Sequence, residues 1–277
     1  MGVAAVVFFR AEDKEAGRRL AARFGADCLD ASAVATAKAR EQSAFFARAV
    51  GAEAVLMVVD AEGLHLRSAG PDALTVRVDF AAAALRYRRL HGGGRDEAIA
   101  KAVGLRSGVF PEVLDATAGL GGDAFVLAGL GCRVRLHERS PEVHALLEDG
   151  LRRRREGGDE ELRRILDRMA LAPAGDAGLA LEGGQTDVVY LDPMFPQRRT
   201  RAQVRKEMQV FHRLVGEDPD ADALLPAALR AARYRVAVKR PRIAPALAGP
   251  APSHVLEGKR NRFDIYAKRR LPDGLGR

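Results

Sequence analysis

The sequence predicts an α/β protein in which a doubly wound parallel sheet follows a small N-terminal α/β domain. From residue 111 onward, strand-like and helix-like segments alternate, which is the pattern of a parallel sheet with helices on both faces. A glycine-rich loop at residues 115–123 follows the first strand of this series. Residues 1–79 have a β-rich pattern of their own and no cluster of chemically reactive side chains. We therefore expect two domains, residues 1–79 and 80–277.

The N-terminal domain is expected to contain short apolar strands and one amphipathic helix. An apolar run, an amphipathic stretch and a hairpin with a tight turn at Glu62–Gly63 follow one another. We expect strands at Val3–Phe9, Ala54–Asp60, Gly63–Arg67 and Thr75–Phe80, and a helix at Asp13–Phe24. Residues 80–104 have a helical pattern that three glycines, residues 92–94, interrupt.

The second domain reads as a βαβαβ series. Pro141 favours the first turn of a helix, and the β-branched run before Asp192 is typical of a strand buried on both faces. We expect strands at Glu112–Asp115, Arg133–Glu138, Thr186–Asp192, Arg235–Lys239 and Arg262–Ala267. We expect helices at Gly122–Leu130, 141–154, Glu160–Met169, Ala202–Val215 and Ala221–Ala232, with a loop at Pro173–Gly178.

Composition and charge indicate a cytoplasmic protein with a polyanionic partner. Hydrophobic residues make up 47% of the chain and charged residues 30%, which excludes disorder over the whole length. No apolar run approaches the ~20 residues of a membrane span. Cys28 and Cys132 show neither metal-site nor disulfide spacing, so we expect no metal and a reducing compartment. The net charge is +8, and residues 233–277 alone contribute twelve basic and three acidic side chains. Such a cluster suits a nucleic acid.

The glycine-rich loop favours a cofactor without phosphate. Ligands of doubly wound sheets bind at such loops, and Gly119 and Gly121 let the backbone approach a ligand without a Cβ clash. The spacing also satisfies the loose dinucleotide pattern G-x-G-x-x-A. Asp115 and Asp123 would repel a pyrophosphate, which prefers bare amides at a helix N-terminus. They suit S-adenosylmethionine (SAM), because it carries an ammonium and a sulfonium group.

Two further acidic residues follow predicted strands. Glu138 stands where a carboxylate can accept hydrogen bonds from ribose hydroxyls, in either class of cofactor. Asp192 opens a loop that Pro193 and Pro196 stiffen. Asp192 could accept a hydrogen bond from a substrate amine, with the carbonyl of Pro193 as a second acceptor, and Phe195 could stack on a base. Methyl transfer to nitrogen is an in-line displacement that depends on such positioning, and no cysteine lies nearby to act as a nucleophile.

These motifs resemble those of the RsmJ family, the 16S ribosomal RNA guanine-N2 methyltransferases. The resemblance extends from about residue 79 to residue 267. It rests on several blocks in order, namely residues 92–104, 115–121, 123–128, 131–135, 138–139, 189–196, 206–208, 238–241 and 262–266. The resemblance implies a Rossmann-like SAM-dependent methyltransferase sheet, SAM as the methyl donor, and N2 of a guanosine in small-subunit rRNA as the acceptor.

The resemblance also implies a set of cofactor contacts. By position they fall on Gly122, Asp123, Glu138, Arg139, Gly175, Asp176 and Asp192. The family often has an arginine where Gly122 stands, so we expect a backbone contact there. It often has two serines in place of Gly175 and Asp176, and Asp176 could still accept a hydrogen bond from the adenine amino group.

Basic residues near the strand ends are the expected RNA contacts. We expect Arg198 and Arg199, beside the Asp192 loop, and Lys239 and Arg240 to bind RNA phosphates. Arg95, after the three glycines, could help to clamp an anion. Three alternatives remain open at this point: an amino-methyltransferase acting on DNA or protein, an NAD-dependent oxidoreductase, and a non-catalytic RNA-binding or ribosome assembly protein.

Overall fold

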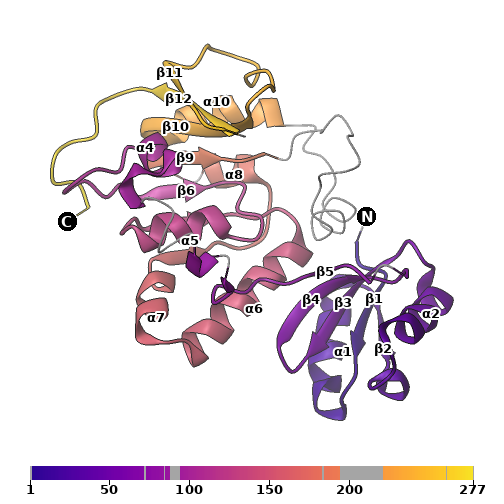
Figure 1. Ribbon diagram of the computed structural model, residues 1–277. Helices are drawn as coiled ribbons and strands as arrows, with labels where there is room; N and C mark the ends of the chain where they lie inside the picture. The colour runs from indigo at the N-terminus through magenta and orange to yellow at the C-terminus, as the bar shows by residue number, and fades with distance from the viewer. Residues whose placement is uncertain are drawn as a thin grey trace. The chain divides into compact units, whose positions relative to one another are not determined.

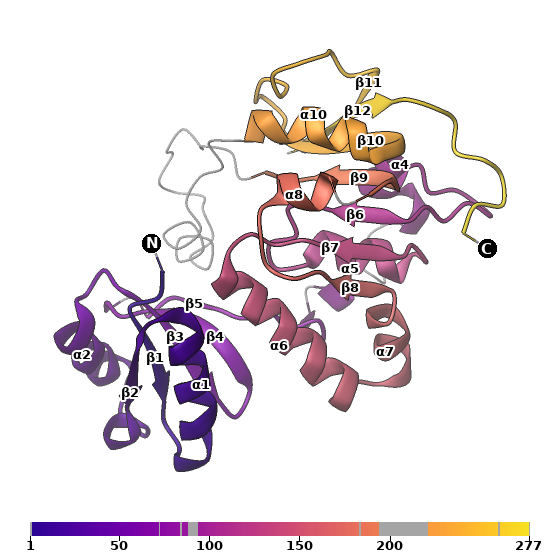
Figure 2. The ribbon, with the colours of Figure 1, turned by 180° about the vertical axis from the view of Figure 1, so that it is seen from behind.

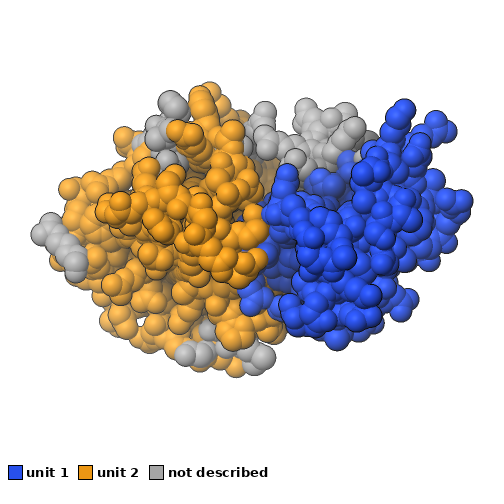
Figure 3. Space-filling view, turned by 90° about the horizontal axis from the view of Figure 1, so that it is seen from below, with its two compact units in different colours: residues 1–78, 145–150, 197–217 blue, residues 79–144, 151–196, 218–277 orange. Residues whose placement is uncertain are grey.

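The computed structural model divides the chain into two compact units (Figures 1 and 3). It describes residues 2–71, 73–83, 85–87, 94–182, 184–193, 221–259 and 261–276. Of these, unit 1 contains residues 2–78 and 145–150, and unit 2 contains the rest. The predicted division into two domains, residues 1–79 and 80–277, remains a prediction. None of the helices in the described segments combines the length and apolar character that a bilayer span requires.

In the described residues, unit 1 has a five-stranded mixed sheet, two complete α-helices and residues 145–150 of a third, α6 (Pro141–Gly157). The strand order is β2-β1-β3-β4-β5, with β1 parallel to β2 and β3, and β3 antiparallel to β4. The strands are β1 (Ala5–Phe8), β2 (Asp27–Asp30), β3 (Val55–Asp60), β4 (Gly63–Ser68) and β5 (Thr75–Val76), and the helices are α1 (Lys14–Phe24) and α2 (Ala39–Val50). Alternate residues of β1 and β3 pack with Phe46 in one apolar core.

Unit 2 holds a seven-stranded sheet in the order β11-β12-β10-β9-β6-β7-β8. Strands β6 to β10 are parallel, and β12 is antiparallel to both β10 and β11. The strands are β6 (Val113–Asp115), β7 (Val134–Leu136), β8 (Met169–Leu171), β9 (Thr186–Leu191), β10 (Ala232–Pro241), β11 (His254–Glu257) and β12 (Asn261–Ala267). This order confirms the predicted doubly wound, Rossmann-like sheet.

Helices cover both faces of this sheet. Helices α4 and α5 lie on the near face in Figure 1, and α8 and α10 lie on the near face in Figure 2. The helices are α4 (Ala98–Val103), α5 (Gly122–Gly129), α6 (Pro141–Gly157), α7 (Glu160–Leu166), α8 (Ala177–Glu182) and α10 (Ala221–Ala231). An apolar core that includes Leu114, Val189 and Leu225 lies between the sheet and the pair α8 and α10. Both faces being covered explains why β9 is a continuous buried run.

The structure corrects several predicted elements. The helix expected at Glu160–Met169 ends at Leu166, and Met169 begins β8, which pairs with β7. The loop expected at Pro173–Gly178 ends early, because α8 begins at Ala177. Of the strand expected at Thr75–Phe80, only Thr75 and Val76 pair. The predicted helix at 202–215 lies outside the described residues.

Five of the described strands and α-helices had no counterpart in the prediction. They are β2, α2, β8, α8 and β11. Strands β2 and β11 are edge strands with charged or polar side chains, so they lack the apolar alternation by which strands are recognised in a sequence. Strand β8 has only three residues, and it is recognised as a strand because it pairs with β7.

A buried histidine in unit 1, His65, makes the stability of this unit depend on pH. Nδ1 of His65 lies 3.0 Å from Nη2 of Arg77 and 3.3 Å from Oδ2 of Asp60. Burial lowers the pKa of His65 to about 4, with the charge of Asp60 opposing and that of Arg77 assisting the change. In the unfolded chain, His65 binds a proton once the pH falls below ~6.5. In the folded chain, it binds a proton only when the pH approaches its lowered pKa. The free energy of unfolding therefore decreases as the pH falls between these two values.

We expect His65→Gln to weaken the acid sensitivity of the protein. The wild type should lose on the order of 2 kcal/mol more than the variant between pH 6.5 and pH 4, because only the wild type must keep His65 neutral. Urea denaturation at several pH values measures this difference. If the free energy of unfolding changed with pH equally in the two proteins over that range, the lowered pKa of His65 would be contradicted.

Candidate active site

The acidic residues singled out in the sequence meet at the carboxyl edge of the unit 2 sheet. Strand β6 lies between β7 and β9, so the direction of the strand order reverses there, and ligands of such sheets bind outside this point. Asp115 is the last residue of β6, Glu138 follows β7, and Asp192 follows β9. Three segments far apart in the sequence thus bring carboxylates to one place.

Glu138 holds the glycine-rich loop in its turned conformation. Its Oε2 accepts a hydrogen bond from the backbone N–H of Gly119 at 2.9 Å, and its Oε1 accepts one from the N–H of Ser140 at 2.8 Å. Gly119 and Gly121 have φ angles of 54° and 75°, a region that favours glycine. A Cβ at Gly122 would meet nothing nearer than 3.9 Å. The loop therefore leaves open space at the start of α5.

Thr117 ties the glycine-rich loop to the residue that follows β9. The backbone N–H of Asp192 donates to Oγ1 of Thr117 at 2.6 Å, and the N–H of Thr117 donates to Oδ1 of Asp115 at 3.2 Å. This chain of hydrogen bonds joins the ends of β6 and β9. Sequence reasoning missed Thr117, because a threonine between two alanines has no signal of its own.

Lys239 of β10 joins two of the carboxylates. Its Nζ donates to Oδ2 of Asp123 and to Oδ2 of Asp192, both at 2.8 Å. The hydroxyl of the buried Tyr190 donates to the same oxygen of Asp123 at 2.7 Å. Sequence reasoning missed Tyr190 as a site residue, although the hydroxyl of a tyrosine in a buried strand usually has a hydrogen-bond partner.

The electrostatics of this group reflect burial and crowding of like charges. Asp115 is 2% exposed, and burial, together with the charges of Asp123 and Asp192, raises its pKa well above the usual value. Burial alone would lower the pKa of Lys239, but Asp192 and Asp123 raise it on balance. In the described part of the chain, the carboxylates of Asp115, Asp123 and Asp192 interact with one another and with the ammonium of Lys239, and such an acidic group favours a cationic ligand.

The structure also places Gly175 next to the end of β7. Its N–H lies 3.4 Å from the carbonyl oxygen of Glu138, and its carbonyl oxygen lies 2.9 Å from Nε2 of the buried His137. Asp176 is exposed, and its Oδ1 accepts a hydrogen bond from the N–H of Gly178 at 2.7 Å. Arg139 follows Glu138 and is half-buried. Most of the predicted cofactor residues therefore come from neighbouring strand ends.

Two of the predicted RNA contacts have partners within the protein, and their role toward RNA stays a prediction. The ammonium of Lys239 binds Asp123 and Asp192. Arg240 is 1% exposed, and its guanidinium donates to the carbonyl oxygen of Pro245. Phe195, Arg198 and Arg199 lie outside the described residues.

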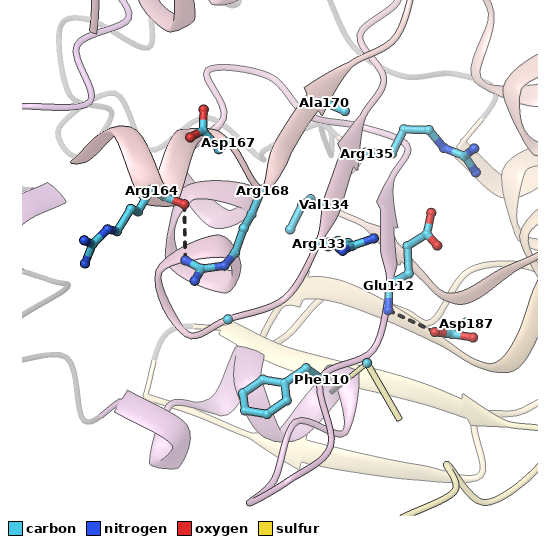
Figure 4. Close-up of a pocket in the computed structure, with 12 residues that line it drawn as sticks. Phe110, Glu112, Arg133, Val134, Arg135, Arg164, Asp167, Arg168, Ala170 and Asp187 are labelled. Carbon is cyan, nitrogen blue, oxygen red and sulfur yellow. Dashed lines mark hydrogen bonds between the residues drawn. The ribbon is translucent and has the colours of Figure 1, made fainter. Parts of the chain in front are cut away.

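A pocket at the opposite edge of the sheet is separate from this site (Figure 4). It measures about 980 Å³ and lies at the amino ends of the strands, where Glu112, Arg133 and Asp187 line it. One oxygen of Asp187 accepts a hydrogen bond from the N–H of Glu112 at 3.0 Å. Because the ligands of doubly wound sheets bind at the carboxyl edge, we do not assign this pocket to the candidate active site.

Comparison with known proteins gives a consistent result. A family model of SAM-dependent methyltransferases matches residues 42–268. A protein of Cellvibrio japonicus named ribosomal RNA small subunit methyltransferase J is 52% identical over 79% of this chain and 85% of its own length. A protein of the same name from Pseudomonas fluorescens is 55% identical over 77% of this chain and 82% of its own.

A solved structure agrees over nearly the whole chain. The crystal structure of a SAM-dependent methyltransferase from Neisseria gonorrhoeae superposes with a TM-score of 0.66 and 36% sequence identity. The match covers 95% of this chain and 96% of that one. The similarity therefore includes the N-terminal part of the chain, where the sequence motifs were uninformative.

We expect Lys239→Met to lower the free energy of unfolding by about 3 kcal/mol, because it leaves buried carboxylates without their counter-charge. Adding Asp123→Asn should recover at least about 1 kcal/mol by removing one of those charges. Urea denaturation at pH 7 of both variants and of the exposed control Lys259→Met measures the effect. A Lys239→Met protein as stable as the control would contradict the importance of this contact.

Proposed function

The chain belongs to the family of ribosomal RNA small subunit methyltransferase J, a family of SAM-dependent enzymes, and from this premise we propose that it methylates the exocyclic N2 of a guanosine in 16S rRNA. The observation that carries the proposal is the position of Asp192. Asp192 follows β9, and its carboxylate is 39% exposed and bound by Lys239. Its backbone N–H donates to Thr117, which holds the residue beside the glycine-rich loop. A hydrogen-bond acceptor at that point is suited to orient an amine toward a bound methyl donor.

The residues at the carboxyl edge fit SAM better than a dinucleotide. The open space at Gly122 and the positive φ angles of Gly119 and Gly121 form a cradle of backbone. Among the residues that the structure describes, Asp115, Asp123 and Asp192 gather around the ammonium of Lys239, and we infer that this acidic group attracts a cationic cofactor and repels a pyrophosphate. When bound, SAM supplies an electrophilic methyl group on sulfur. The open alternative of an NAD-dependent oxidoreductase is thereby disfavoured.

We assign the cofactor contacts to the loops that end β6, β7, β8 and β9. Glu138 would accept hydrogen bonds from the ribose hydroxyls while it holds the loop through Gly119. The exposed Asp176 would accept a hydrogen bond from the adenine amino group. The full set proposed for cofactor binding is Asp115, Gly119, Gly122, Asp123, Glu138, Arg139, Gly175, Asp176 and Asp192.

Asp192 has the central role in the proposed reaction. Its carboxylate accepts a hydrogen bond from the amine, which directs the nitrogen lone pair toward the incoming methyl carbon. The nitrogen would take the methyl group as the bond between methyl and sulfur breaks, with S-adenosylhomocysteine as the leaving product. The carboxylate of Asp192 would stabilise the positive charge that develops on the nitrogen until one N–H proton is released to solvent. Lys239 fixes the carboxylate through a hydrogen bond from its Nζ to Oδ2 of Asp192. We propose the carbonyl of Pro193 as a second acceptor and Phe195 as the aromatic surface on which the guanine stacks.

The RNA substrate defines the remaining proposals. Arg198 and Arg199 follow the Asp192 loop in the sequence and are our proposed phosphate contacts. Family membership favours ribosomal RNA over DNA or protein as the acceptor. We place the enzyme in the cytoplasm, where small ribosomal subunits are assembled.

Calorimetry tests the proposed cofactor. We expect S-adenosylhomocysteine to bind and NAD to give no heat of binding. Glu138→Ala should weaken S-adenosylhomocysteine binding at least about tenfold, because it removes a hydrogen-bonded carboxylate. The matched control Glu112→Ala, at the opposite edge of the sheet, should bind like the wild type. Binding of NAD alone would overturn the proposal.

Radiolabelled methyl transfer tests the role of Asp192. With small subunits from cells lacking the enzyme, Asp192→Ala should reduce transfer by about 100-fold or more, because charge stabilisation at the reacting nitrogen is lost. Its affinity for RNA should stay within a few-fold of the wild type. Asp167→Ala, which lies in the pocket at the amino edge, is the control. Nucleoside analysis should identify N2-methylguanosine, and full activity of Asp192→Ala would refute the assignment.

A further inference from the structure

The loop after β10 is held unusually firmly for an exposed segment. Arg240 donates from Nε and Nη2 to the carbonyl oxygen of Pro245, at 3.0 and 2.6 Å. Arg262 donates from Nη1 to the carbonyl oxygens of Arg242 and Ala244, at 2.9 and 2.5 Å. Two arginines from neighbouring strands thus bind three carbonyls of one short loop. We call residues 242–247 the clamped loop.

The clamp is itself anchored by a buried carboxylate. Asp264 is 1% exposed and accepts hydrogen bonds from Nε and Nη2 of Arg262 at 2.7 and 3.0 Å. Arg240 lies opposite Arg262 in the antiparallel pair of β10 and β12. Burying charged groups is unfavourable unless they are fully hydrogen-bonded. An arrangement of this kind is expected where the exact path of a backbone matters for binding.

The rest of the clamped loop packs inward and leaves its tip exposed. Ala244 and Leu247 are buried, whereas the side chain of Ile243 is 96% exposed and Arg242 is also exposed. Among the residues that the structure describes, Ile243 is the most exposed large hydrophobic side chain. Single exposed apolar residues are common on protein surfaces. This one differs because four hydrogen bonds fix the backbone on both sides of it.

The clamped loop lies at the same edge of the sheet as the candidate active site. In the parallel pair of β9 and β10, Val238 is opposite Leu191, and the next residues, Lys239 and Asp192, touch. Ile243 follows Lys239 by four residues, so its Cα lies no more than about 14 Å from that of Lys239. The tip is therefore within reach of nucleotides that flank a target base at Asp192.

We propose that the tip of the clamped loop is an RNA-contact element, in which Ile243 packs against a base next to the target guanosine and Arg242 binds an adjacent phosphate. A base must leave its stack to reach a catalytic pocket, and isoleucine is one of the apolar side chains that proteins insert between bases. The partner is polyanionic RNA, in keeping with the excess of basic residues after residue 232. This inference rests on the proposed function and adds a substrate contact to it.

The test compares Ile243→Ala with wild-type enzyme on small subunits. We expect kcat/KM for methyl transfer to fall about tenfold, the lower end of what contact with a base contributes. Ile243→Leu should restore most of the activity, and S-adenosylhomocysteine affinity by calorimetry should be unchanged in both variants. Val255→Ala, which shortens another exposed apolar side chain on β11, is the matched control. Arg242→Gln should reduce the slope of log affinity for 16S rRNA against log salt by about 1.

Each contrary result identifies a different error. Wild-type kcat/KM and RNA affinity in both Ile243→Ala and Arg242→Gln would overturn the inference and leave the proposed function intact. The inference would also be overturned if these variants lost S-adenosylhomocysteine affinity to the same extent as kcat/KM. The same holds if they changed only the self-association of the protein. If the wild type transfers no methyl group to small subunits, the proposed function fails. Filter binding of 16S rRNA to wild type, Ile243→Ala and Arg242→Gln still decides whether the loop contacts RNA.

Discussion

The ion contacts of Lys239 are the interaction on which the rest of the site depends. One ammonium on β10 binds a carboxylate from the first turn of α5 and another from the loop after β9. Tyr190 and Thr117 complete the group with hydrogen bonds to the same two aspartates. Without this positive charge, the repulsion among three buried or half-buried carboxylates would be unbalanced, and the loops that carry them would be destabilised in their present positions.

Among the described residues of the same region, it is charge that favours a cationic ligand. Burial and neighbouring charges raise the pKa of Asp115, which means that the protein alone does not fully stabilise its charged form. A positively charged cofactor would supply that stabilisation. Glu138, by contrast, accepts two backbone hydrogen bonds and shapes the glycine-rich loop. The acidic residues therefore divide between shaping the loop and attracting the ligand.

Arg240 and Arg262, near the carboxyl edge, hold the backbone of a loop in place. Arg240 and Arg262 donate to loop carbonyls, and Asp264 neutralises Arg262. The sequence blocks 238–241 and 262–266, which carried part of the family resemblance, are therefore two halves of one structural device. Basic residues in a polyanion-binding protein need not all be ligands of the polyanion, because some of them fix the shape of the surface that binds it.

The sequence by itself determined the doubly wound sheet, the glycine-rich loop and the acidic residues at strand ends, because apolar periodicity and glycine spacing are local properties. It also predicted SAM as the cofactor, because the acidic residues Asp115 and Asp123 stand at the two ends of the glycine-rich loop in the sequence. Only the tertiary structure decided that Lys239 and Arg240 serve the protein's own carboxylates and carbonyls. It also revealed Thr117 and Tyr190 as members of the site and the short strand β8. The physical reason is that the partner of a side chain depends on which strands become neighbours in the sheet, and a local sequence pattern contains no information about strand order.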